Sequence, residues 1–302
     1  MAYRRLSRKR ATRPRRRVAR KRYTPRRSYT ARTPRYRKKG MSRRSLLNIT
    51  SRKKQDTMLT YTNATATNRY GGSYNTIPAV LQAASGALDY EFLYIATARN
   101  STTSPGNFSN INDAASRTAT RTYMRGIKEK IEVQTSDGTP WQWRRICFCY
   151  KGPTILQSLT NYLAFAETAP NGYTRTINDL SNQAGVLHAE VFDGTKGQDW
   201  NDTIIAPVDR ARCTVKYDKT VRFASGNNAG VMKRLSLWHP MNKTLVYDDD
   251  EEGGQIGVNP LSVNTNIGMG DYYIYDIIRP LNGASGSQMS VNIASTLYWH
   301  ER

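Results

Sequence analysis

The stretch CTVKYDKTVRF at residues 213–223 decides the expected fold, because apolar and polar side chains alternate along it. An alternation with a period of two is typical of a β-strand with one buried and one solvent-facing side. The residues expected to face the core are Cys213, Val215, Tyr217, Val221 and Phe223. Those expected to face water are Thr214, Lys216, Asp218, Thr220 and Arg222. The stretch therefore predicts a strand of a β-sandwich.

Two further segments alternate in the same way. In residues 127–134, the side chains expected to point outward are Lys128, Lys130, Glu132 and Gln134. In residues 291–300, those expected to face the core are Val291, Ile293, Leu297 and Trp299. Successive side chains of a strand point to opposite faces, so both segments predict strands with one wet face.

Runs of aromatic and β-branched residues predict strands that are covered on both faces. These runs are residues 89–97, 141–151, 234–248 and 271–279, and a first strand is expected near 56–62. The total is about eight strands, and the βαβ rhythm of an α/β enzyme fold is missing. We therefore expect an all-β fold, a single eight-stranded jelly roll of two packed antiparallel sheets.

Short helices are expected in one long connection between strands. Residues 153–166 place apolar side chains at helical spacing behind Pro153, a residue suited to a first helical turn. A second helix is expected to begin with Thr176 as its N-cap and to bury Ile177 and Leu180. Both helices would form an insertion into the sandwich.

Positive charge is concentrated in the first part of the chain. The protein has 46 Lys and Arg against 23 Asp and Glu. Residues 1–54 hold 24 of the basic residues and no acidic one, which leaves residues 55–302 with a net charge of −1. With almost no large aliphatic side chains, residues 1–54 cannot offset their chain entropy by burial. We expect a disordered basic arm at 1–54 and one folded domain at 55–302.

The arm has the composition of a nucleic-acid-binding segment. The stretch RATRPRRRVARKRYTPRR at residues 10–27 has ten Lys or Arg in eighteen positions. Interspersed prolines oppose helix formation, and tyrosines can stack on unpaired bases. The residues expected to bind phosphates are Arg4, Arg5, Arg8, Lys9, Arg10, Arg13, Arg15, Arg16, Arg17, Arg20, Lys21, Arg22, Arg26 and Arg27, and those expected to stack are Tyr23, Tyr29 and Tyr36.

The same arm predicts a nuclear-import signal that host import receptors bind. Its residues are Arg15, Arg16, Arg17, Arg20, Lys21 and Arg22. A solubilising tail is the weaker interpretation, because blocks of one sign are usually interaction tails. A patch for anionic membranes stays open, although no amphipathic apolar face accompanies the charge. We expect no transmembrane segment, since no window approaches 18 consecutive apolar residues.

The acidic run DDDEE at residues 248–252 is expected to be an exposed loop between strands. The alternative is a hard cation held by Asp248, Asp250 and Glu252, but the run lacks the spacing of an EF-hand loop. The run therefore predicts neither a metal site nor a catalytic carboxylate pair.

The cysteines are expected to be buried thiols. Cys147 and Cys149 are two apart, so on a strand they share a face, and free cysteine behaves as a small hydrophobe. Zinc would need further ligands at recognised spacing, and the chain offers only Cys213 and three scattered histidines, His188, His239 and His300. An odd count of three fits a reducing compartment better than a disulfide framework.

Catalytic signatures are missing from the sequence. It has no G-x-x-x-x-G-K-[ST] phosphate loop, no G-x-S-x-G elbow and no H-E-x-x-H motif. We therefore expect no enzyme activity, no cofactor and no metal.

Several segments resemble the capsid proteins of genomoviruses of the gemycircularvirus type and, more distantly, geminivirus coat proteins. They occur in order over nearly the whole chain. They are the Arg-rich start, RRSLLNITSRKKQDTM (43–58), WQWRRICFCYKG (141–152), LWHPMNKTLVYDDDE (237–251), DYYIYDIIRP (271–280) and STLYWHER (295–302). Some geminivirus coat proteins are described with a Cys/His zinc-like motif, for which this sequence has no corresponding ligand set.

The resemblance implies a capsid subunit that self-assembles into a small icosahedral T=1 shell, a homo-oligomer of roughly 60 copies. The arm would lie inside against a circular single-stranded DNA genome; DNA, as opposed to RNA, follows from the resemblance alone. The implied locations are the virion and, during assembly, the host nucleus. Two alternatives stay open: a non-structural nucleic-acid-binding nuclear shuttle protein, and an enzyme acting on nucleic acid through a metal near residues 248–252.

Overall fold

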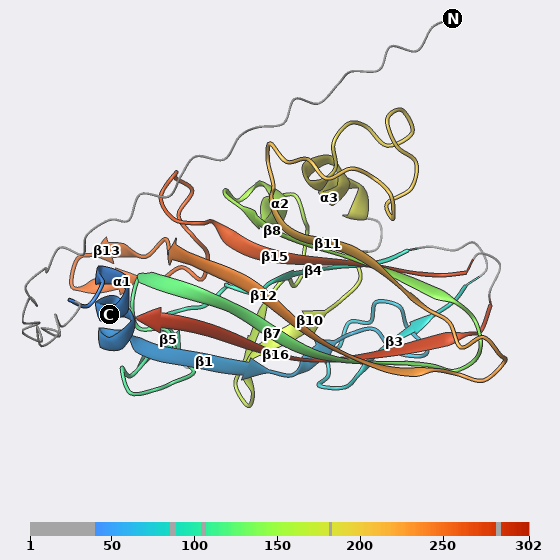
Figure 1. The fold of residues 1–302 in the computed structure, drawn as a ribbon, viewed down its shortest axis with the longest axis horizontal. Coiled ribbons are helices and arrows are strands. Elements are labelled where there is room, and N and C mark those ends of the chain that lie inside the picture. Colours follow the sequence, from blue (N-terminus) through green and yellow to red (C-terminus); the bar gives the residue numbers. More distant parts are fainter. Residues whose placement is uncertain (1–39, 85–88, 104–106, 181–182, 282–284, 302) are drawn as a thin grey trace, which may run out of the picture. The chain divides into compact units, whose positions relative to one another are not determined.

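Two antiparallel sheets, one of five strands and one of four, form the framework of the computed structural model (Figure 1). It describes residues 40–84, 89–103, 107–180, 183–281 and 285–301. The first sheet has the order β1–β16–β7–β12, with bounds Arg52–Met58, Gln288–Glu301, Arg121–Thr135 and Met232–Val246, and β3 (Ala79–Gln82) also pairs with β16. The second has the order β11–β8–β15–β4, with bounds Thr214–Phe223, Trp141–Tyr150, Asp271–Pro280 and Tyr90–Ile95.

The strand pairing identifies the fold as a jelly roll. β1 pairs with β16, β4 with β15, β7 with β12 and β8 with β11, and every pair is antiparallel. The chain thus follows a long hairpin of four nested strand pairs, which alternate between the two sheets. Eight strands connected in this way make the double-sheet jelly roll. The predicted all-β jelly roll of two packed antiparallel sheets is confirmed.

The second sheet is covered on both faces. Its strands β4, β8 and β15 are buried over almost their whole lengths, as predicted for residues 89–97, 141–151 and 271–279. The same prediction for residues 234–248 is wrong. β12 lies at the edge of the first sheet, and most of its residues are partly or fully exposed because no described segment covers their outer side.

A β-bulge divides the strand from which the fold was predicted. In β11, Val215 lies opposite Phe148 and Tyr217 lies opposite Cys147, so Lys216 is an extra residue. Since Phe148 and Cys147 are neighbours on β8, they point to opposite faces. Val215 consequently packs on the outer face of the second sheet, whereas Tyr217 points between the sheets. The expectation of one shared apolar face holds only after the bulge.

The outer face of the second sheet is covered by the long connection from β8 to β11 (Figure 1). This connection contains α2 (Thr154–Gln157), β9 (Ala166–Thr168), β10 (Gly172–Ile177) and α3 (Ala184–Val191). Short helices in one long connection are therefore confirmed. The helix expected at Thr176 is wrong, because Thr176 and Ile177 belong to β10, which pairs in parallel with β2 (Thr60–Thr62). The first helix is a single turn, and Asn161, with φ of 54°, follows it.

A helix and the start of a strand lie before the expected boundary at residues 54 and 55. α1 spans Arg43–Thr50 and β1 starts at Arg52, so the compact unit is Arg43–Arg302. Lys54 is buried, with Nζ 3.3 Å from Glu301 Oε2 and donating to the Ser116 carbonyl at 2.7 Å. The boundary predicted from the distribution of charge is too late in the chain. Lys54 counts as a basic residue of the arm by its charge, but its buried partners make it part of the sheet.

Two small hairpins complete the described elements. They are β5–β6 (Thr102–Thr103 and Asn107–Phe108) and β13–β14 (Asp250–Glu252 and Gln255–Gly257). The acidic run is thus partly a strand where a loop was expected. Its Asp249 is held by Arg117, whose Nη2 lies 2.9 Å from Asp249 Oδ1 and whose guanidinium lies 3.9 Å from the Tyr247 ring centre.

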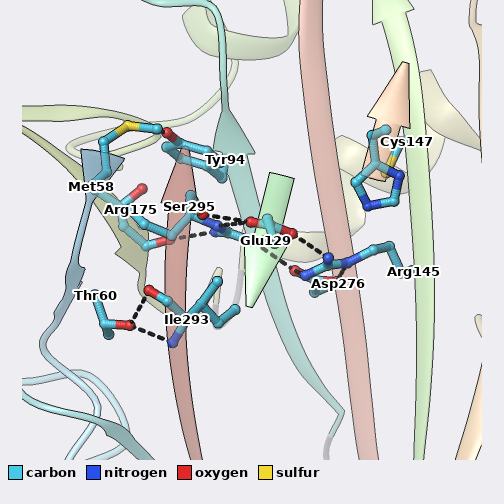
Figure 2. A network of polar contacts seen from close by, with 12 residues as sticks. Met58, Thr60, Tyr94, Glu129, Arg145, Cys147, Arg175, Asp276, Ile293 and Ser295 are labelled. Carbon is cyan, nitrogen blue, oxygen red and sulfur yellow. Dashed lines mark hydrogen bonds and ion pairs between the residues drawn. The ribbon is translucent and has the colours of Figure 1, made fainter. Parts of the chain in front are cut away.

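Four charged side chains meet between the sheets (Figure 2). This buried ring consists of Glu129 of β7, Arg145 of β8, Arg175 of β10 and Asp276 of β15. Arg175 Nε lies 2.9 Å from Glu129 Oε1, and Arg175 Nη2 lies 3.0 Å from Asp276 Oδ2. Arg145 Nε lies 2.6 Å from Asp276 Oδ1, and Arg145 also pairs with Glu129. Two positive and two negative groups thereby link both sheets and β10.

Neighbouring donors complete the ring. Ser295 Oγ donates to Glu129 at 2.8 Å, and Trp143 Nε1 donates to Asp276 at 2.8 Å. Buried ion pairs offset the cost of leaving water only when such hydrogen bonds satisfy them. Although burial by itself raises it, the guanidinium groups of Arg145 and Arg175 hold the pKa of Glu129 well below its usual range. Glu129 therefore stays charged around neutral pH.

Replacing Arg175 by Met should strongly destabilise the fold, because Glu129 and Asp276 would each lose a partner and stay buried. The expected loss in free energy of unfolding is about 3–5 kcal/mol, measured by urea denaturation. Arg234→Met is the matched control, since Arg234 is 78% exposed and pairs with Glu132 at the surface. Equal stability of Arg175→Met and wild type would contradict the role assigned to the ring.

His239 of β12 should make stability depend on pH. Burial, followed by the charge of Arg145, lowers the pKa of His239 from 6.5 to about 4. Below pH 6.5 the unfolded chain binds a proton that the folded chain excludes, so the stabilisation is complete above 6.5 and is lost as the pH falls toward 4. The loss should be on the order of 3 kcal/mol. His239→Gln should show a shallower decline in unfolding free energy between about pH 7 and pH 5; parallel curves would refute this.

Candidate nucleic-acid interface

The residues expected from the sequence to bind nucleic acid and import receptors lie outside the described part of the chain. All of them fall within residues 1–39. Their roles as phosphate contacts, stacking groups and import signal therefore stay predictions. The candidate site that the described residues offer is instead on the folded unit.

The outer face of the first sheet is solvent-exposed and basic. In β7, Lys128 and Lys130 point outward and alternate with buried Ile127, Glu129 and Ile131, as the alternation predicted. Lys53 of β1 and Tyr298 of β16 belong to the same outward set by their register. The long strands that carry this face are β1, β16, β7 and β12 (Figure 1).

Positive charge on this face is largely unneutralised. Among the described residues, no carboxylate forms an ion pair with Lys53, Lys128 or Lys130. Glu132 is the acidic residue of the outward β7 set, and it is paired with Arg234, whose Nε lies 2.6 Å away. An anionic partner would therefore meet free ammonium groups here.

A groove of about 770 Å³ lies at one end of this face. Strands β1, β7, β12 and β16 each contribute to its walls. The lining residues are Lys53, Lys54, Gln55, Ala114, Arg125, Lys128, Trp238, Tyr298, Trp299 and His300. The groove combines basic side chains with aromatic rings, which is the composition of single-strand nucleic-acid sites.

Trp238 is the largest exposed ring of the groove. It is 47% exposed, and its ring meets that of Tyr298 edge-on with centroids 5.8 Å apart. The register places it beside Lys128 on the neighbouring strand. The aromatic pair is therefore in direct reach of a free positive charge.

Gly126 makes room for Trp238. A Cβ atom at this position would lie 2.8 Å from Trp238 Cζ2 and 2.5 Å from the His239 carbonyl oxygen. Its φ of 149° is also a conformation that side-chain-bearing residues rarely adopt. The β7 strand is irregular here, because Arg125 is skipped in the pairing with β16. Gly126 and this irregularity together let the indole lie across β7.

Charge around the groove also acts on His300. His300 lies opposite Lys53, and its Nδ1 is 3.4 Å from Ser51 Oγ. Burial, together with the charges of Arg125 and Lys53, lowers the pKa of His300 below 6.5. His300 is thus a neutral hydrogen-bonding group near neutral pH, and the positive charge comes from Lys and Arg.

The described ranges also contain potential metal-ligating side chains and three cysteines. No group of three or more His, Cys, Asp or Glu side chains there is placed to hold a metal ion. Cys147, Cys149 and Cys213 are free and buried, as predicted, and burial raises the pKa of Cys149 to about 11. Within the same ranges, no helix has the length and apolarity to cross a bilayer.

Reasoning from sequence missed the groove. Residues 234–248 were expected to be covered on both faces, so Trp238 was not predicted to be exposed. The groove also depends on the register between strands that are far apart in the chain. The usable signal was the outward Lys128 and Lys130, which sequence alternation did identify.

Comparison with known proteins identifies no family. No family model matches the chain, and no curated protein matches it. Among solved structures, an unassembled pentamer of a mutant Washington University polyomavirus VP1 has 10% sequence identity. The match covers 83% of this chain and 93% of that one with a TM-score of 0.13, which is too low to support any argument about fold or function.

Gly126→Ala should displace Trp238 and destabilise the sheet. The new Cβ would collide with backbone and indole atoms and strain the backbone, at a cost of about 1–3 kcal/mol. Acrylamide quenching of tryptophan fluorescence should rise as the indole leaves the sheet. Gly254→Ala is the control, because its Cβ would meet open space. Unchanged stability and quenching in Gly126→Ala would show that Trp238 does not depend on this glycine.

Proposed function

We infer that the protein is a viral capsid protein, which self-assembles into a closed shell and packages single-stranded DNA. The observation that carries the proposal is a jelly roll with one uncovered sheet face that is basic and bears an aromatic groove. A shell subunit needs one side for the genome, and this face has the charge for it. The role is structural and requires no catalytic group.

The position of the basic arm in the sequence also supports the assignment of this sheet face to the genome. Residues 1–42 hold 19 of the 46 basic residues. They lead through α1 into β1, and Lys53 near the start of β1 lines the groove. The basic arm and the basic sheet face could therefore neutralise the same nucleic acid.

The amount of charge suits a small genome. A shell of roughly 60 copies would carry roughly 1400 positive charges on residues 1–54, comparable to the phosphates of one to two kilobases. The copy number and the choice of DNA are parts of the proposal that rest on the family resemblance, and the import signal at residues 15–22 rests on the basic clusters of the arm.

Exposed apolar side chains at one end of the jelly roll support association between copies. Leu46 and Ile49 of α1 are 50% and 63% exposed, Phe108 of β6 is 58% exposed and Ile256 of β14 is 54% exposed. α1, β5 and β13 lie at the same end of the molecule (Figure 1). Exposed apolar groups gathered in this way mark protein contact sites.

Negative-stain microscopy of the purified full-length protein, combined with extraction of nuclease-protected nucleic acid, tests the proposal. Closed particles with protected single-stranded DNA are expected. Deleting residues 1–40 should leave a folded protein that still forms shells but protects little DNA, because the arm supplies most of the free positive charge. Small oligomers that bind DNA and never close would favour the shuttle-protein alternative, and loss of folding on the deletion would contradict the division into arm and body.

A further inference from the structure

We propose that the groove on the first sheet binds an unpaired nucleotide, with its base stacked on Trp238 and its phosphates at Lys53 and Lys128. This inference deepens the proposed function, because it assumes a nucleic-acid partner and names the form in which the folded domain holds it. The site consists of residues of the folded unit Arg43–Arg302 and has its own selectivity, for single strands over duplexes.

The state of Trp238 is the first support. Of the five tryptophans, four are at most 7% exposed, and Trp238 is 47% exposed. Tyr298 holds one edge of the indole and Gly126 supports it from below, so the ring is placed without being covered. An indole held in this way is a stacking platform, because any base can lie on its face.

The placement of charge is the second support. In the first sheet, β1 and β7 flank β16, so Lys53 and Lys128 lie on the two strands beside that of Tyr298. They are placed diagonally about it, since Lys53 is paired with His300 and Lys128 with Thr296. Neighbouring strands are about 4.8 Å apart, which puts the two strands that carry these lysines about 10 Å from each other. A nucleotide seated on the aromatic pair would therefore have ammonium groups on both sides for the phosphates that precede and follow it.

The chemistry of the partner follows from these two features. A duplex buries the faces of its bases in its own stack, so its bases cannot reach Trp238. An unpaired strand exposes them, and single-strand sites join aromatic platforms to basic grooves for this reason. Since stacking uses the face that all bases share, the groove should tolerate any sequence.

The test uses the full-length protein and the fluorescence of its one exposed tryptophan. An oligo(dT) of about ten nucleotides, labelled so that anisotropy follows its binding, should quench tryptophan emission and protect Trp238 from acrylamide. A duplex of the same length and an abasic oligomer with the same phosphates should bind without quenching.

Variants separate stacking from charge. Trp238→Leu should abolish the fluorescence change and weaken oligo(dT) binding roughly fivefold or more, whereas Trp238→Phe should retain most of the affinity. Lys53→Gln combined with Lys128→Gln should reduce the salt dependence of binding, and Lys216→Gln combined with Lys219→Gln on the second sheet serves as the charge-matched control. Thermal unfolding of each variant confirms that it folds.

The outcomes distinguish the two proposals. Oligo(dT) that binds by anisotropy and leaves Trp238 unquenched and unprotected overturns the groove site, while the capsid proposal stands. Equal quenching by the abasic oligomer or the duplex overturns stacking of an unpaired base. Absence of any binding by anisotropy overturns the proposed function itself, and the groove site with it.

Discussion

The buried ring of Glu129, Arg145, Arg175 and Asp276 is the constraint on which the jelly roll depends. It joins β7 of one sheet to β8 and β15 of the other, and through Arg175 it fixes β10 at the side of the sandwich. Charge pairs held out of water offset their desolvation only when their geometry is good and further hydrogen bonds satisfy them. The ring thus helps to fix the position of the first sheet relative to the second, and with it the position of the first sheet's outer face.

Much of this architecture could be predicted from local patterns. Alternation in residues 127–134 and 291–300 identified the outward and inward sides of β7 and β16, and apolar runs identified β4, β8 and β15. The bulge at Lys216 could not be predicted, because it depends on the pairing of β11 with β8 and leaves the alternation in the sequence intact. The folded state of residues 43–54 could not be predicted either, because these residues are as basic as the arm. The partner that shows Lys54 to be buried, Glu301, lies near the other end of the chain.

The candidate site shows a similar division. Its charges, Lys128 and Lys130, were visible as outward residues of a predicted strand. Its aromatic part could not be predicted. Trp238 is recognised as a surface residue only when β12 is known to be an edge strand and the indole is known to lie over a glycine of β7. A sequence pattern predicts which face of a single strand is buried, whereas a groove forms only when four strands pair in the correct register.

The pairing of β1 with β16 has a consequence for when the protein can act. Met58 lies beside Ser295 and Lys53 beside His300, so the first and last long strands must meet before the groove has both of its walls. Contacts between such distant segments form late and slowly in folding. A chain still emerging from the ribosome has its basic arm but lacks the groove, and a chain that loses its last strand never acquires it. The topology thereby restricts one mode of nucleic-acid contact to finished subunits.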